Sequence, residues 1–162
     1  MPKLFFLLSG ENKTLPAAEV KAILEAEGYC YSNASEFDQI LRLESEIGSV
    51  QTVQVRSAYT RFCALELFIS NANHDDIAKA AVETDFKAVL KPRESFVVRI
   101  NRIRNYADEE VNTMVLEGKL GKQILNLTEG TKVSLKNPDK TFICILTYYK
   151  IIFFLILRDF CR

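Results

Sequence analysis

Three arginines lie close together in one short segment of the chain. Arg99, Arg102 and Arg104 fall within Ser95–Arg104, whose apolar residues predict a strand. A guanidinium stays charged at any working pH and binds a phosphate through two parallel hydrogen bonds. Because side chains alternate along a strand, Arg102 and Arg104 are expected on one face and Arg99 on the other. The segment is a candidate phosphate-binding strand, or a strand whose exposed ends pair with local acids.

Two glycines and two lysines follow in a segment that predicts a helix. Gly118, Lys119, Gly121 and Lys122 fall within five residues. Each glycine destabilises a helix interior by about 1 kcal/mol relative to alanine. Two of them in one helix therefore indicate a structural or functional role. One interpretation is that the glycines let a nucleic-acid backbone approach while the lysines attract phosphate. The other is close packing of this helix on a sheet.

A basic turn comes after this helix. The dipeptide Asn137-Pro138 predicts a turn. Lys132 and Lys136 on its N-terminal side can attract phosphate, and the Asn137 amide can contact ribose or bases. The same residues also suit a plain hairpin turn without a ligand.

The charge of the chain is divided unequally between its halves. Its net charge of 0 taken alone argues against a nucleic-acid partner. Residues 1–90, however, hold 8 Lys and Arg against 13 Asp and Glu, whereas residues 91–162 hold 13 against 8. This asymmetry suggests an anionic partner for the second half, with a solvated charged face as the alternative.

The remaining residues suggest little competing chemistry. The four cysteines are far apart and His74 is the single histidine, so no zinc-ligand spacing and no disulfide framework is present. Reduced cysteines predict a cytoplasmic protein. His74 precedes Asp75 and Asp76, but adjacent residues of a helix do not face each other, which favours a helix start over a catalytic cluster.

The first half of the chain must supply a scaffold for these residues. Its pattern predicts a strand at Lys3–Ser9, a helix from Thr14 to Gly28, and strands at Tyr29–Asn33 and Gln39–Leu43. This β-α-β-β order corresponds to a truncated ferredoxin-like unit. Val50–Ser57 is ambiguous between strand and helix.

The second half predicts an α-α-β-α-β-β order around a mixed sheet. Its expected helices are Ala58–Ile69, Asp75–Phe86 and Asp108–Leu127, and its expected strands are Ser95–Arg104, Thr131–Leu135, Thr141–Tyr148 and Ile151–Arg158. The apolar run from Thr141 to Leu157 is rich in strand-forming residues and contains Lys150, so it predicts two buried strands and no membrane span. The fold class is α/β (α+β), with domains at residues 1–57 and 58–162.

Three motifs together resemble a known family. The segments Phe96–Ile103, Leu116–Ile124 and Val133–Asp139, with the closing apolar strands, resemble the THUMP domain, an RNA-binding module of tRNA-modifying enzymes. The segments Phe6–Asn12 and Leu157–Arg162 resemble more narrowly the archaeal tRNA guanine-N2-methyltransferases that act on guanosine at position ten. In those enzymes a ferredoxin-like domain and THUMP precede a Rossmann-type methyltransferase domain.

The resemblance implies capture of tRNA by its acceptor stem and its unpaired 3′ CCA end. The expected RNA-binding residues are the basic and glycine positions of these motifs: Arg99, Arg102, Arg104, Gly118, Lys119, Gly121, Lys122, Lys132, Lys136 and Asn137. Tyr106, Phe142 and Tyr148 are candidates for stacking on bases, with a place in the hydrophobic core as the alternative.

The catalytic half of that family has no counterpart in these residues. No Gly-rich loop for S-adenosylmethionine follows a strand, and Asn137-Pro138-Asp139 lacks the second proline and the aromatic of the family's catalytic motif. The expectation is therefore a tRNA-binding module without its own cofactor, which positions tRNA for a methyltransferase domain or subunit. Whether the chain belongs to an enzyme stays open. The alternatives are the N-terminal part of such a methyltransferase, or a scaffold that recruits a partner subunit through its acidic first half.

Overall fold

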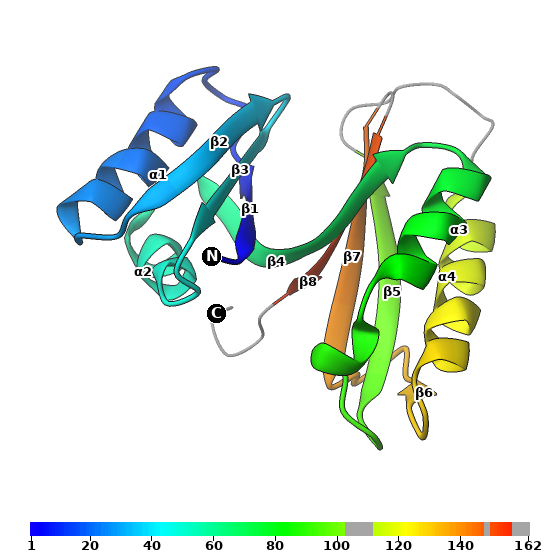
Figure 1. The fold of residues 1–162 in the computed structure, drawn as a ribbon. Coiled ribbons are helices and arrows are strands. Elements are labelled where there is room, and N and C mark those ends of the chain that lie inside the picture. The colour runs from blue at the N-terminus through cyan, green and yellow to red at the C-terminus, as the bar shows by residue number, and fades with distance from the viewer. Residues whose placement is uncertain (103–111, 148–149, 157–162) are drawn as a thin grey trace. The chain divides into compact units, whose positions relative to one another are not determined.

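The structure is a computed structural model that describes residues 1–102, 112–147 and 150–156 (Figure 1). The chain divides into two compact units, Met1–Glu66 with Ile156, and Leu67–Leu155. This division falls inside one strand, β4 (Thr60–Asn71), whereas the sequence placed a domain boundary between residues 57 and 58. Below, the two parts are called unit one and unit two.

Unit one is a six-element ferredoxin-like unit. Its strand order is β2-β3-β1-β4 with antiparallel neighbours, and both helices lie on one face of that sheet (Figure 1). The prediction of this fold is confirmed, and the unit is complete where the sequence suggested a truncated one. Its elements are β1 (Lys3–Leu8), α1 (Leu15–Ala26), β2 (Tyr31–Phe37), β3 (Ile40–Ser45), α2 (Ser49–Arg56) and the first part of β4.

The segment that completes unit one differs from the sequence prediction. The ambiguous segment Val50–Ser57 is helical, and the helix expected over Ala58–Ile69 is wrong, because that segment lies in β4. β4 lies between β1 and β8 in the strand order, and both of its faces bury side chains, as Cys63 and Ala64 show. A strand buried on both faces loses the alternation that distinguishes it from a helix.

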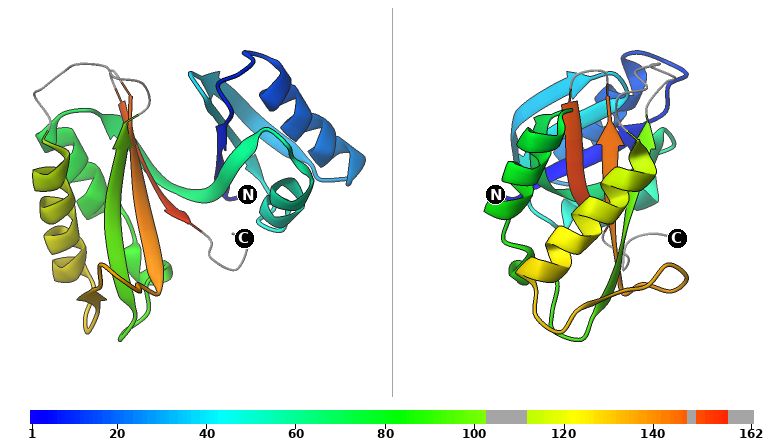
Figure 2. Two further views of the ribbon diagram at one scale, coloured as in Figure 1. Left: turned by 180° about the vertical axis from the view of Figure 1, so that it is seen from behind. Right: turned by 90° about the vertical axis from the view of Figure 1, so that its right-hand side faces the viewer.

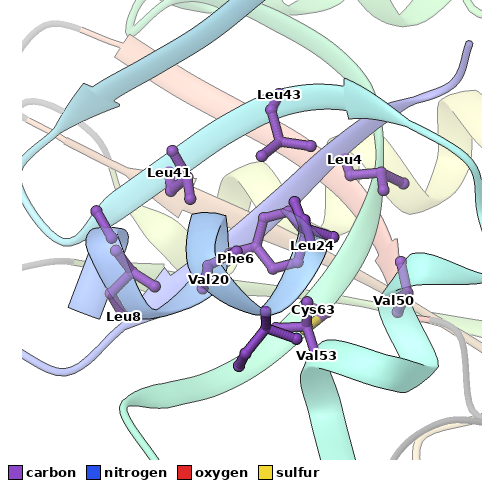
Figure 3. Close-up of a cluster of buried hydrophobic side chains, with 12 residues drawn as sticks. Leu4, Phe6, Leu8, Val20, Leu24, Leu41, Leu43, Val50, Val53 and Cys63 are labelled. Atoms are coloured by element: carbon purple, nitrogen blue, oxygen red, sulfur yellow. The ribbon is translucent and has the colours of Figure 1, made fainter. Parts of the chain in front are cut away.

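The core of unit one lies between its sheet and its two helices. Figure 3 shows side chains of β1, β3, α1, α2 and β4 pointing into one cluster, with Phe6 among them. On α1, Val20 and Leu24 are four residues apart and both are completely buried, as one face of a helix requires. Burying a side chain as large as Phe6 contributes about 2 to 3 kcal/mol.

Unit two contains the segment of the predicted interface. In the order β4-β8-β7-β5-β6, β5 runs parallel to both β6 and β7, and α3 and α4 lie side by side on one face of the sheet (Figures 1 and 2). Its elements are the end of β4, α3 (His74–Glu83), the 3-10 helix η1 (Phe86–Ala88), β5 (Ser95–Arg102), α4 (Thr113–Leu127), β6 (Lys132–Val133), β7 (Lys140–Leu146) and β8 (Lys150–Ile156).

Aromatic side chains form the core of unit two. Phe142 packs edge-on against Phe86 and Phe96 and stacks on Phe153, with ring centroids 5.6 to 5.8 Å apart. Phe142 is completely buried, so it belongs to the core and is not an aromatic that stacks on a base. The other two candidates, Tyr106 and Tyr148, lie outside the described residues.

The apolar run near the C-terminal end forms β7 and β8, as the sequence predicted. In the described part of the chain, every helix is too short or too polar to cross a membrane.

Candidate nucleic-acid interface

β5 has one covered edge and one largely uncovered edge. On one side it pairs with β7 from Phe96 to Arg102, and on the other it pairs with β6 only at Ser95 and Phe96. That second ladder ends where the Ser134 N–H donates to the Phe96 carbonyl oxygen at 2.9 Å. Among the described residues, no strand therefore covers this edge of β5 from Val98 onward.

A groove of about 320 Å³ follows the uncovered edge. β5 contributes one side, α4 the second and the segment after β6 the third. The residues of α4 that line the groove recur at helical spacing and form one stripe: Met114, Glu117, Gly118, Gly121, Lys122 and Leu125. Val133, at the end of β6, and Leu135, two residues after it, also line the groove.

The two glycines of α4 keep this groove wide. A Cβ atom added to Gly118 or to Gly121 would meet no other atom within 4 Å. Close packing of the helix on the sheet, one of the two interpretations of these glycines, is therefore not their role. The large buried side chains of α4 are Leu116, Leu120 and Ile124; Gly121 is also buried, but the space beside its Cα is large enough for a Cβ atom.

Cationic side chains lie at and beside the groove. Arg99 and Lys122 line it, and the Arg99 Nη2 lies 3.5 Å from the Leu135 carbonyl oxygen. Lys119 is exposed on α4 outside the lining stripe. None of the ion pairs found among the described residues uses these three cations. Their charges are therefore available to an external anion.

The other predicted contact residues are distributed around the groove. Arg102 is exposed at the end of β5, Lys132 is exposed in β6, and Lys136 and Asn137 are exposed in the turn before β7. Arg104 lies outside the described residues. Of the ten predicted positions, the structure brings four together at the groove: Arg99, Gly118, Gly121 and Lys122.

A serine and an aspartate fix the basic turn against β5. The Ser95 N–H and Oγ both donate to Asp139 Oδ2, at 2.7 and 2.6 Å, and the Asp139 N–H donates to Ser95 Oγ at 3.0 Å. Sequence reasoning treated Asp139 only as a turn residue and missed this pairing. The two residues are 44 positions apart, so no local pattern signals their contact. The contact joins the end of this turn to β5, and Lys136 and Asn137 are exposed within the turn.

Among the described residues that line the groove, Glu117 is the one acidic residue. Its Oε1 accepts a hydrogen bond from the Ile100 N–H at 2.8 Å, which occupies one backbone donor on the uncovered edge of β5. Burial, and secondarily the nearby Glu117 carboxylate, raise the pKa of the Cys144 thiol well above its usual value. Cys144 is therefore neutral, and among the described residues that line the groove Glu117 is the one that carries a carboxylate.

Asp76, in the acidic segment beside His74, takes part in capping α3. The Asn73 side chain accepts from the Asp76 N–H at 2.8 Å, and the side-chain amides of Asn71 and Asn73 both donate to Asp76 Oδ2. These amides lower the pKa of Asp76. The pattern is that of a helix N-terminus. Within the described ranges, no group of three His, Cys, Asp or Glu side chains could hold a metal ion.

Comparison with known proteins identifies the family. Residues 71–151 match the THUMP domain, which covers half of the chain. The chain therefore belongs to the THUMP domain family, as the resemblance of its motifs predicted.

Individual relatives extend this likeness to unit one. The chain is 29% identical over 136 residues to a tRNA (guanine(10)-N2)-dimethyltransferase of Methanothermobacter thermautotrophicus, which corresponds to 84% of this chain and 38% of that protein. PH1313 of Pyrococcus horikoshii has a TM-score of 0.67 at 19% identity, over 96% of this chain and 54% of its own. A 4-thiouridine synthetase, solved with RNA and ATP, has a TM-score of 0.63 at 12% identity, over 96% and 41%. The two structures show a shared fold, and the chain spans only part of each relative.

Proposed function

We propose that this chain is a tRNA-binding module that captures the acceptor stem and the unpaired 3′ CCA end for a tRNA-modifying enzyme. The observation that carries the proposal is the groove along the uncovered edge of β5, lined by two glycines and by Arg99 and Lys122, which form no ion pair with another described residue. Membership of the THUMP family supports it. So do the relatives, one named for a reaction on tRNA and one solved with RNA.

The cations divide the work of binding between two parts of the RNA. Lys119, Lys132 and Lys136 are exposed outside the groove and bind phosphates of the duplex stem. Arg99 and Lys122, at the groove, bind phosphates of the unpaired end. Phosphate contacts supply affinity and position, while unpaired bases supply recognition.

The chemistry is assigned to a methyltransferase domain or subunit that binds S-adenosylmethionine. The sequence of this chain has no recognisable loop for that methyl donor. Its role in the proposal is to bind and orient the tRNA.

A scaffold that recruits a partner through unit one has less support. The exposed large apolar side chains described in that unit are far apart in the chain: Met1, Leu15, Ile47 and Val55. Isolated apolar residues are normal on a protein surface and do not indicate a docking patch.

Binding of the full chain to a labelled acceptor-stem minihelix tests the proposal. The minihelix with its CCA end should bind more tightly than the same duplex without it, and affinity should fall steeply as salt rises. Equal binding of the two RNAs would refute capture of the 3′ end. The absence of binding at low salt would refute the RNA-binding function as a whole.

Charge reversal separates RNA binding from recruitment of a protein. Lys119→Glu and Lys122→Glu should each weaken binding and lower the slope of log affinity against log salt by about 1. Lys13→Glu, an exposed lysine of unit one, is the matched control and should leave that slope unchanged. Equal effects of the three variants would indicate a general attraction and no defined interface.

A further inference from the structure

The groove beside β5 carries more apolar surface than phosphate binding requires. Met114 is 79% exposed, Leu135 66% and Val133 45%, and all three line the groove. Large apolar side chains that gather around one hollow mark a binding site, whereas single ones do not. Apolar side chains do not stabilise a bound phosphate or ribose, which are polar, but they do stabilise the flat ring of a base.

Two sets of polar groups face the same hollow. Backbone groups alternate between the two edges of a strand, so the N–H and C=O of Val98 point to the same edge as those of Phe96, where β6 ends. Glu117 binds the Ile100 N–H with one carboxylate oxygen. In the described part of the chain, no group donates to its second oxygen. The apolar walls therefore enclose a backbone donor and a carboxylate acceptor.

We propose that this groove holds one unpaired base of the bound RNA and selects a base that carries an exocyclic amino group. The inference rests on the proposed function and adds the subsite and its preference. Met114 and Leu135 contact the ring, the amino group donates to the second oxygen of Glu117, and the Val98 N–H donates to a ring acceptor. Adenine, cytosine and guanine carry such an amino group. Uracil does not, and would place a carbonyl oxygen against the carboxylate.

The charges around the groove favour RNA over a peptide as its occupant. Arg99 and Lys122 line the groove together with the apolar side chains, and Glu117 is the one carboxylate among its described lining residues. A nucleotide chain matches this combination, because its phosphates meet the cations while its base reaches the carboxylate. A peptide strand added to the edge of β5 would bring backbone groups and no anion to those cations.

Three minihelices with the same duplex and different 3′ ends test the base preference. One is blunt, one has an unpaired CCA end, and one has three unpaired uridines. The full chain should bind the CCA form about tenfold more tightly than the uridine form, as loss of one good base contact predicts. In Glu117→Gln this ratio should fall to about twofold or less, because an amide can donate to the uracil carbonyl oxygen. The amide oxygen still accepts from Ile100, so the fold is retained.

Filling the groove gives a second, independent measurement. In Gly118→Leu, the side chain enters the groove, so the CCA form should lose its advantage over the blunt form while the blunt form binds as before. Ala18→Leu places the same side chain on an exposed position of α1 and is the matched control.

The outcomes separate the base site from the proposed function. If CCA binds more tightly than the blunt form but no better than uridine, or if Glu117→Gln leaves the ratio unchanged, selection by Glu117 is overturned and capture of RNA stands. If Gly118→Leu leaves the CCA advantage intact, the groove is not the site of the base. If no RNA binds at low salt, both proposals are overturned.

Discussion

The two units each contain a sheet edge, and the two edges have opposite character. β2, the edge of unit one, carries exposed Ser32, Asn33 and Glu36, and its pairing with β3 is irregular between Ser32 and Ser35. Polar residues and irregular backbone protect an edge strand from pairing with other molecules. The uncovered edge of β5 in unit two is instead bordered by apolar side chains and by two glycines. The β2 edge is therefore protected from pairing with another molecule, whereas the β5 edge can bind one.

The same contrast holds for polar groups. In unit one, Glu19 accepts from Ser57 Oγ at 2.5 Å and from the N–H groups of Ala58 and Tyr59 at 3.0 and 3.1 Å, which ties α1 to the start of β4. In unit two, Glu117 binds one backbone donor and faces a groove. In unit one, the carboxylate of Glu19 therefore connects two segments of the fold. In unit two, one carboxylate oxygen of Glu117 accepts no hydrogen bond from a described residue.

The largest expected effect is a loss of stability in the closed unit. Phe6→Ala should lower the free energy of unfolding by about 3 to 5 kcal/mol, because it leaves a cavity at a completely buried site. Met114→Ala in the groove should change it by less than about 0.5 kcal/mol, since Met114 is exposed, but should weaken binding of the CCA minihelix. Denaturant unfolding measures the first difference. A comparable loss of stability in both variants would contradict the contrast between the units.

The next largest effect is the pH-dependent contribution of Glu19 in unit one to the free energy of unfolding. Burial raises the pKa of Glu19, but the hydrogen bonds from Ser57, Ala58 and Tyr59 outweigh it, so the pKa lies below its usual value of 4.5. A carboxylate with a lowered pKa stabilises the fold above the unfolded pKa, and this contribution is lost as pH falls through the folded pKa. Glu19→Gln should lower the free energy of unfolding by about 1 to 2 kcal/mol at pH 7.

The free energy of unfolding of the natural chain and of Glu19→Gln, measured between pH 7 and pH 3, checks the direction of this pH dependence. The difference between the natural chain and Glu19→Gln should shrink as pH falls below about 4.5. A difference that stays constant or grows toward low pH would show that the carboxylate charge is not what stabilises this connection.

A smaller effect is expected at the protected edge. Asn33 has a φ of 52° in the irregular part of β2, a left-handed conformation that asparagine tolerates and β-branched residues resist. Asn33→Val should therefore destabilise unit one by about 1 to 2 kcal/mol, whereas Asn33→Gly should be nearly neutral. Equal stabilities of the two variants would show that the backbone irregularity does not depend on this residue.

The smallest effects concern glycines and have opposite signs in the two units. Gly28 follows α1 with a φ of 75°, so Gly28→Ala should destabilise by about 1 kcal/mol. Gly121→Ala should stabilise by about 0.5 to 1 kcal/mol, because the position is helical and an added Cβ meets no atom within 4 Å. Thermal unfolding of the two variants measures both signs. A destabilised Gly121→Ala would mean that the glycine serves packing after all.

Much of the fold could be predicted from the pattern of residues. The type and order of the elements from Lys3 to Leu43 were predicted, although the strand expected at Tyr29–Asn33 extends over Tyr31–Phe37. The two apolar strands after Lys140 also carry strong local signals, and the THUMP resemblance of the second half is confirmed. The segment Ala58–Ile69 could not be assigned correctly. This segment is a strand because it lies between β1 and β8 in the sheet. That position depends on the tertiary structure and not on the local pattern of residues.

Residue types and spacing were enough to nominate candidate anion-binding residues, among them Arg99, Lys119 and Lys122. Which of these candidates line one groove, and that Glu117 and Val98 lie there with them, followed only from the packing of the elements. The groove forms because β6 pairs with just two residues of β5, so no described strand covers the rest of that edge beside α4. Contacts across such distances in the chain, like that between Ser95 and Asp139, depend on the packing of whole elements and leave no local pattern.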